Sequence, residues 1–105
     1  MKNPVLKVGD LEIDTRRRSA SRGGREIELT AREYSLLELL ALRSGEVVSR
    51  ADIWEQLYDF NQDPESNVVD VFVAYLRRKI ESDDKPKLIH TRRGMGYILE
   101  ERVES

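Results

Sequence analysis

Arginines and glycines cluster near the end of the chain in a pattern that suits binding to phosphates. Arg92 and Arg93 directly precede Gly94 and Gly96 within residues 91–97. The glycines permit a tight turn with positive φ angles. Guanidinium groups on such a slim turn suit the minor groove of a DNA duplex, where negative potential attracts them. Taken alone, without the preceding helix, these residues fit an ordinary solvated hairpin with two arginines better.

The segment before this turn predicts a helix with two different faces. At about 100° per residue, an apolar stripe forms the expected core face, and it consists of Val69, Val73, Leu76 and Ile80. The opposite face mixes small, apolar, aromatic and basic groups, namely Asn67, Val68, Val71, Ala74, Tyr75 and Arg78, flanked by Lys79, Asp70 and Arg77. Base edges, thymine methyls and phosphates in a major groove offer partners for this mixture. Packing of Val71 and Tyr75 on another part of the protein, or on an oligomer partner, is the alternative.

The charge distribution is compatible with DNA binding, although the formal net charge is −2. Residues 31–65 carry three basic and eight acidic side chains, whereas residues 66–99 carry seven basic and four acidic ones. DNA responds to the local field, because exposed charges more than about 10 Å apart are largely screened. A basic C-terminal third and an acidic middle are compatible with DNA on one face and a protein on another. A merely solvated surface explains the asymmetry equally well.

The sequence lacks the residue patterns of catalytic and metal sites. It contains no cysteine, and His90 is its only histidine. Thiolate zinc sites, disulfides, cysteine nucleophiles and paired histidine ligands are therefore excluded. There is no Gly-x-Ser-x-Gly motif or phosphate-binding loop, and Gly94-Met95-Gly96 is too short to be one. We expect no enzyme activity, cofactor or metal, and a surface or boundary position for His90.

Length and hydropathy predict one small domain. The chain has 105 residues, of which 39% are hydrophobic and 36% charged. No apolar run approaches the roughly 20 residues of a membrane span, and the N-terminus has no signal-peptide pattern. We expect a soluble, cytoplasmic protein without a membrane partner, its single domain spanning residues 1–105.

The first thirty residues predict a small antiparallel sheet of about four strands. Residues 5–8 and 11–13 are short β-type runs, and Gly9-Asp10 between them is a hairpin signal. Two further runs flank residues 22–24, and the second ends at residues 27–29, where alternation places Ile27 and Leu29 on one face.

Capping signals divide the rest of the chain into helices. Thr30 and Glu33 form a capping-box pattern before a helix that Ser44-Gly45 ends. After a brief extended piece at residues 47–48, Ser49 is the expected N-cap of a second helix over residues 50–57. A loop over residues 58–65 leads to a third helix, which Ser66 or Asn67 caps and which ends near residue 80.

Two final strands, at residues 88–91 and 97–99, are expected around the turn at residues 93–96. The order is therefore four strands, a helix, a short strand, a helix, a loop, a helix and a hairpin. This order predicts an α+β fold, a winged helix-turn-helix with an N-terminal four-stranded sheet, three helices and a C-terminal hairpin wing.

Two long segments of the chain resemble a known family. They are IELTAREYSLLELLALRSGEVVSRADIWEQLYD and SNVVDVFVAYLRRKIESDDKPKLIHTRRGMGYILE. They are similar to the C-terminal effector domains of OmpR/PhoB-type response regulators. The family's helix pattern, VDV-x-(I/V)-x-x-LR-x-K-(I/L), is matched by residues 69–80. Its wing pattern, TVRGxGY, is matched by residues 91–97, except that Arg92 replaces the usual valine. The resemblance covers essentially the whole chain.

The resemblance implies a DNA-binding transcription regulator of a two-component system, with helix 67–80 in the major groove and wing 91–97 at the minor groove. It implies groove or base contacts at Asn67, Val68, Asp70, Val71, Ala74, Tyr75, Arg78 and Arg93. It implies phosphate contacts at Tyr58, Phe72, Arg77, Thr91, Arg92 and Tyr97. Some relatives have arginines at the positions of Ala74 and Tyr75, and an alanine cannot hold a phosphate. Arg77, Arg78 and Arg93 are therefore expected to supply more of the attraction.

The family also implies partners beyond a single DNA site. The acidic loop at residues 58–65 corresponds to the family's transactivation loop, so Asp59, Asp63 and Glu65 are candidate contacts to RNA polymerase. A solvated connecting loop is the alternative. The resemblance further implies direct-repeat promoter DNA bound by a head-to-tail pair of domains.

Family members normally carry an N-terminal receiver domain, and no such domain fits before Val5. We therefore expect either an excised effector domain or a stand-alone regulator, and favour the former because residues 1–4 resemble the end of an interdomain linker. Such a domain is expected to be a monomer that pairs only on DNA. A winged helix that makes only protein contacts is the remaining alternative, and salt-independent affinity would favour it.

Overall fold

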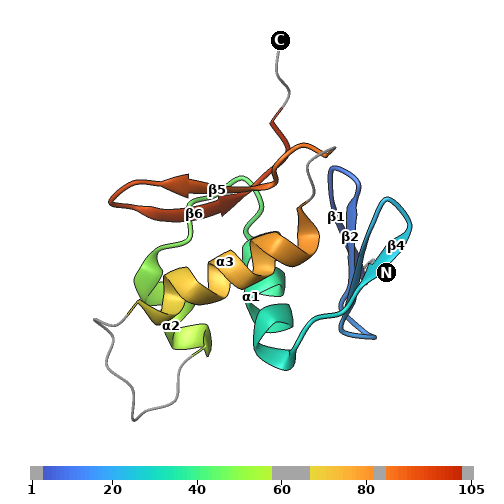
Figure 1. Ribbon diagram of the computed structural model, residues 1–105, viewed down its shortest axis with the longest axis horizontal. Helices are drawn as coiled ribbons and strands as arrows, with labels where there is room; N and C mark the ends of the chain where they lie inside the picture. Colours follow the sequence, from blue (N-terminus) through green and yellow to red (C-terminus); the bar gives the residue numbers. More distant parts are fainter. Residues whose placement is uncertain (1–3, 58–66, 82–84, 103–105) are drawn as a thin grey trace.

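The computed structural model describes residues 4–57, 67–81 and 85–102. Four strands, β1 (Val5–Val8), β2 (Leu11–Asp14), β3 (Ser19–Arg22) and β4 (Arg25–Ile27), form one antiparallel sheet in chain order. Three helices follow, α1 (Ala31–Leu42), α2 (Arg50–Leu57) and α3 (Val68–Ile80). The strands β5 (Ile89–Arg92) and β6 (Gly96–Leu99) form a C-terminal antiparallel hairpin. The predicted architecture is confirmed, with the helices central, the sheet at one side and the hairpin alongside α3 (Figure 1).

The N-terminal sheet presents one apolar face to the helices. Along β2, Leu11 and Ile13 are buried while Glu12 between them is exposed, as the period of two residues in a strand requires. Ile13 lies opposite Ala20 of β3, which is also buried. The last predicted strand is shorter than expected, because β4 ends at Ile27 and Leu29 lies outside it.

Local capping signals were predicted correctly for α1 and α2. The Thr30 hydroxyl accepts a hydrogen bond from the Glu33 amide (3.2 Å), and the Glu33 carboxylate accepts one from the Thr30 amide (2.9 Å). This capping box satisfies two of the free N–H groups at the start of α1. Ser49 accepts a hydrogen bond from the Asp52 amide (3.1 Å), so α2 begins where the sequence indicates.

The apolar stripe of α3 is confirmed, while its N-terminus differs from the prediction. Val69, Val73, Leu76 and Ile80 are all buried. Asn67 occupies the N-cap position but its side chain makes no capping hydrogen bond, because its backbone (φ −84°, ψ 23°) is not in the extended conformation typical of a side-chain cap. The alternative cap, Ser66, lies outside the described residues.

A short extended segment before α2 attaches the hairpin to the helices. The amide of Val48 donates to the carbonyl of Tyr97 (2.8 Å), and the amide of Tyr97 donates back to the carbonyl of Val48 (3.0 Å). This bridge confirms the extended piece predicted at residues 47–48. It adds a third short chain segment beside β6 and fixes the base of the hairpin against the core.

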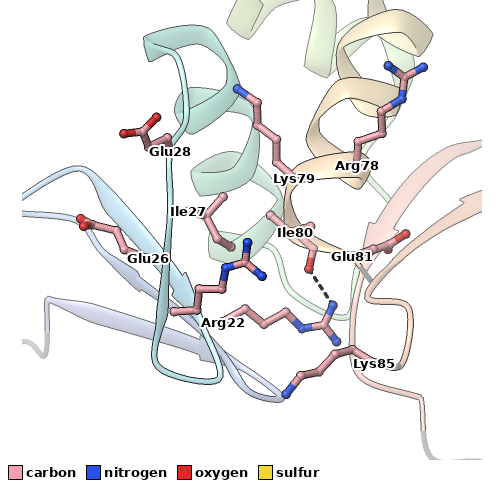
Figure 2. A pocket seen from close by; sticks show the side chains of 10 residues that line it. Arg22, Glu26, Ile27, Glu28, Arg78, Lys79, Ile80, Glu81 and Lys85 are labelled. Atoms are coloured by element: carbon pink, nitrogen blue, oxygen red, sulfur yellow. Dashed lines mark hydrogen bonds between the residues drawn. The ribbon is translucent and has the colours of Figure 1, made fainter. Parts of the chain in front are cut away.

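A buried arginine connects the N-terminal sheet to the end of α3. Arg22 at the end of β3 donates to the carbonyls of Ile80 (2.8 Å) and Pro86 (2.5 Å) and pairs with the carboxylate of Asp10 (2.9 Å). Figure 2 shows the bond to Ile80 beneath the last turn of α3. A cation at this place complements the negative end of the helix dipole. Arg22 therefore fixes the orientation of α3 relative to the sheet.

None of the helices described here is long and apolar enough to cross a membrane. His90 is half-buried on β5, with its Nε2 atom 3.2 Å from the carbonyl oxygen of Glu100. Its predicted boundary position is therefore confirmed.

Candidate nucleic-acid interface

The outer face of α3 is open to solvent over most of the predicted surface. Asn67, Ala74 and Arg78 are exposed, Val71 is half-buried, and Tyr75 retains 45% of its accessible surface. Val68 is the exception, because it packs against the core instead of pointing fully outward. Val68, the first residue of α3, is therefore partly covered and partly open on the outer face.

Two neighbours orient the exposed ring of Tyr75. Phe72 meets it edge to face, with ring centroids 6.4 Å apart and an interplanar angle of 82°. The guanidinium of Arg78 lies 5.9 Å from the centre of the Tyr75 ring. Edge-to-face and cation–π contacts both favour a defined ring position. The middle of α3 thus presents a supported aromatic group beside a cation.

The hairpin tip is slim, basic and exposed. Arg92, Arg93 and Met95 are exposed, and the Met95 amide closes the turn on the Arg92 carbonyl (2.9 Å). Gly94 has φ +72°, in the left-handed region that glycine adopts most easily. Arg93 is therefore presented at the end of a hairpin with little side-chain bulk around it.

The N-terminal half of α3, α2 and the hairpin meet at Asp70. Its Oδ1 atom accepts a hydrogen bond from Arg50 of α2 (2.5 Å) and another from the hydroxyl of Tyr97 on β6. The Arg50 bond, followed by the Tyr97 bond, holds the pKa of Asp70 below its ordinary value. Burial and the bond to Asp70 raise the pKa of Tyr97, so its hydroxyl keeps its proton and remains a donor. Asp70 therefore joins three elements through one carboxylate oxygen.

A second set of contacts joins the C-terminal half of α3 to the hairpin. Arg77 donates to the hydroxyl of Thr91 (2.7 Å) and to the carbonyl of Ile89 (3.2 Å). Its guanidinium also lies 5.5 Å from the centre of the Tyr97 ring. Together with the Asp70 contacts, these bonds fix the hairpin relative to α3 along its length.

A large groove on the other side of α3 is less suited to a polyanion. It has a volume of about 720 Å³ and lies between β4 and the end of α3 (Figure 2). Several of its cations are already paired within the protein: Arg22 and Lys85 with Asp10, and Lys79 with Glu33. Glu26, Glu28 and Glu81 also line it. Of the residues that line this groove, we assign only Arg78 to the interface.

The structure brings most of the predicted site residues onto α3 and the hairpin. The exposed ones are Asn67, Ala74, Tyr75, Arg78, Thr91, Arg92 and Arg93. The partly covered ones are Val68, Asp70, Val71, Phe72 and Arg77. Tyr97 is buried, with its ring under Arg77 and its hydroxyl directed at Asp70. Tyr58, Asp59, Asp63 and Glu65 lie outside the described residues.

Sequence reasoning missed Arg50, which pairs with Asp70. Twenty residues separate the two, and no local pattern connects the first turn of α2 with the first turn of α3. An arginine near the start of a helix is unfavourable to the helix dipole, and this was the one available signal that it serves a tertiary contact.

Comparisons with known proteins agree with this geometry. Residues 24–99 match a family described as "Transcriptional regulatory protein, C terminal". The chain is 50% identical over 101 residues to the transcriptional activator protein IrlR of Burkholderia pseudomallei, covering 96% of this chain and 44% of IrlR. It is 49% identical over 100 residues to the transcriptional regulatory protein PcoR of Escherichia coli, covering 95% of this chain and 44% of PcoR. The chain thus spans less than half the length of these relatives.

Solved structures show the same fold. The DNA-binding domain of CpxR from E. coli superimposes with a TM-score of 0.79 at 34% identity, covering 93% of this chain and 97% of that domain. The DNA-binding domain of RstA from Klebsiella pneumoniae, in complex with the RstA box, superimposes with a TM-score of 0.81 at 27% identity, covering 93% of this chain and 98% of that domain.

Proposed function

The chain belongs to the family of transcriptional regulatory protein C-terminal domains, and from this membership we propose that it binds specific promoter DNA as the effector domain of a two-component response regulator. The observation that carries the proposal is the pairing of an open, mixed face on α3 with a basic, exposed hairpin tip that is bonded to the same helix. A helix and a wing in this arrangement fit a major groove and the adjacent minor groove.

The proposed docking places α3 in the major groove. Tyr75 is central to base reading, because it is the exposed aromatic group on this face and Phe72 and Arg78 hold its ring. Other groove contacts are proposed for Asn67, Val68, Asp70, Val71, Ala74 and Arg78. Asp70 can contribute through Oδ2, because both of its bonds to Arg50 and Tyr97 use Oδ1.

The proposed wing contact places Arg93 in the minor groove. Phosphate contacts are proposed for Arg77, Thr91 and Arg92, and for Tyr58, Phe72 and Tyr97. Tyr97 has little free surface, so its main role in this docking is to support Arg77 and to hold the hairpin on Asp70. Phosphate contacts fix the register on the duplex, while groove contacts select the sequence.

The proposal extends to the partners of the whole protein. We infer a receiver domain elsewhere in the full-length regulator, because this chain spans 44% of the relatives that it matches. We also propose a cytoplasmic location, a monomer in the absence of DNA, and head-to-tail pairs on direct repeats. A contact to RNA polymerase through Asp59, Asp63 and Glu65 completes the proposal.

The wing assignment is tested by replacing Arg93 and measuring DNA affinity as a function of salt. An Arg93→Ala variant should bind more weakly, and the slope of log affinity against log salt should fall by about one unit, as expected when one DNA-bound cation is lost. Arg16→Ala is the matched control, because Arg16 is an exposed arginine in the turn after β2. Equal affinity and slope for the two variants would show that Arg93 makes no DNA contact.

A further inference from the structure

The proposed docking places a strand of the DNA backbone between α3 and the hairpin. If α3 occupies the major groove and the wing occupies the adjacent minor groove, the sugar–phosphate strand that separates these grooves must pass between the two elements. This inference rests on the proposed function. The side chains that line the space between α3 and the hairpin are therefore candidates for contacts to the backbone of that strand.

A groove of about 380 Å³ lies between the C-terminal half of α3 and β5. Arg77 and Thr91 line it, and they are the phosphate contacts already proposed. Three further residues extend the lining away from the hairpin tip: His90 on β5, Lys87 before β5, and Arg102 after β6. The groove therefore carries three cations, Arg77, Lys87 and Arg102, at its wall and its far end.

The charges facing this groove leave it positive. Glu81 is the single carboxylate that lines it within the described residues, and its Oε2 atom accepts the amides of Leu88 and Ile89, both at 3.1 Å. Arg102 bonds through Nε to Glu100 (3.1 Å), but 47% of its side chain is exposed. Lys87 is exposed, and none of the ion pairs among the described residues involves it. Lys87 and Arg102 thus retain charge that a phosphate can neutralise.

We propose that this groove is a binding site for consecutive phosphodiester groups of the DNA strand, in which Lys87 and Arg102 extend the contact made by Arg77 and Thr91. The hydroxyl of Thr91 supplies a neutral donor near the hairpin, and Arg77 is held in place by Thr91 and Tyr97. The Glu81 bonds to the backbone fix the start of β5 and so position Lys87 and His90 at the groove. The far end of the groove adds affinity without sequence preference, because phosphates carry no base information.

The test is a Lys87→Ala/Arg102→Ala double variant, measured on a short duplex that the wild-type domain binds. The slope of log affinity against log salt should fall by about two units. The ratio of wild-type to variant DNA affinity should therefore shrink about tenfold between roughly 50 mM and 200 mM salt. Lys7→Ala/Arg16→Ala is the matched control, because it removes the same charge from exposed positions on the N-terminal sheet. The control should keep the wild-type slope, and all variants should show the wild-type urea unfolding midpoint.

Neutral methylphosphonate linkages locate the contact. In the DNA strand that passes between α3 and the hairpin, one or two such replacements should weaken DNA binding by the wild-type domain. The same replacements should leave the DNA affinity of the double variant unchanged. The inference is overturned if the double variant and the control have the same salt slope, or if no methylphosphonate distinguishes the double variant from the wild type. A loss of binding by the double variant to an acidic protein partner, with DNA binding unchanged, would also overturn it. If the wild-type domain binds no DNA at low salt, the proposed function itself has failed.

Discussion

The hydroxyl of Tyr97 on β6 donates a hydrogen bond to the carboxylate of Asp70 on α3. This bond joins the two elements that are proposed to enter different grooves of the duplex. Because Arg50 bonds to the same carboxylate oxygen, α2 belongs to the same unit. The relative position of wing and helix is thus fixed in the protein before any DNA is bound.

Removal of either Asp70 or Tyr97 should lower the free energy of unfolding, because each substitution removes the same hydrogen bond. Hydrogen bonds to charged groups contribute about 1.5–3 kcal/mol, and the partial exposure of Asp70 reduces this to about 1 kcal/mol for Tyr97→Phe. In an Asp70→Ala background, Tyr97→Phe should then cost almost nothing. Urea unfolding of the two single variants and the double variant measures this coupling. Strictly additive effects would show that the bond does not contribute to stability.

Two glycines of the hairpin should respond very differently to alanine. A Cβ atom on Gly96 would lie 2.1 Å from the carbonyl oxygen of Val48, and the φ angle there is +141°. Gly96→Ala should therefore cost about 3 kcal/mol or more, through strain and displacement of the hairpin. At Gly94 only the positive φ opposes a side chain, and Gly94→Ala should cost about 1 kcal/mol. Unfolding midpoints that are equal for the two variants would contradict this account.

Stability should fall in acid partly through Glu33. Burial acts to raise the pKa of Glu33, but the bonds from Lys79 and Thr30 outweigh it, so the pKa lies below its ordinary value of 4.5. Above that value the folded protein has the full benefit of these bonds, and it loses the benefit as pH falls through the lowered folded pKa. Urea midpoints from neutral pH to about pH 3 should decline, and Glu33→Gln should reduce this decline. If the urea midpoint of the Glu33→Gln variant falls with pH as much as that of the wild type, Glu33 does not contribute to the loss of stability in acid.

The features predicted best from the sequence are those set by neighbouring residues. The capping box needs only Thr30 and Glu33, and the buried face of α3 follows from the spacing of four apolar residues. The start of α2 follows from Ser49. Each of these signals lies within a single helix and its cap, so it can be read without knowing the fold.

The contacts that position the interface could not be predicted in this way. Arg22 bonds to a carbonyl 58 residues away, and in the sequence it appears only as part of a turn. Arg50 of α2 and Tyr97 of β6 meet at Asp70, and this junction depends on the tertiary fold, whereas the sequence indicated Asp70 only as a candidate groove contact. A helical wheel places Val68 on the outer face, because the wheel shows only the spacing of residues along the helix. It does not show that the core covers part of Val68.

The central claim is that this domain recognises a particular DNA sequence through α3 and the wing. The most direct test is selection of bound sequences from a random duplex pool at near-physiological salt, with the Tyr75→Ala variant selected in parallel. We predict enrichment of a short direct repeat with half-sites about one helical turn apart, and a different preferred sequence for the variant at similar non-specific affinity. Absence of any enriched sequence, together with absence of binding at low salt, would contradict the claim and leave a protein-contact role for the winged helix.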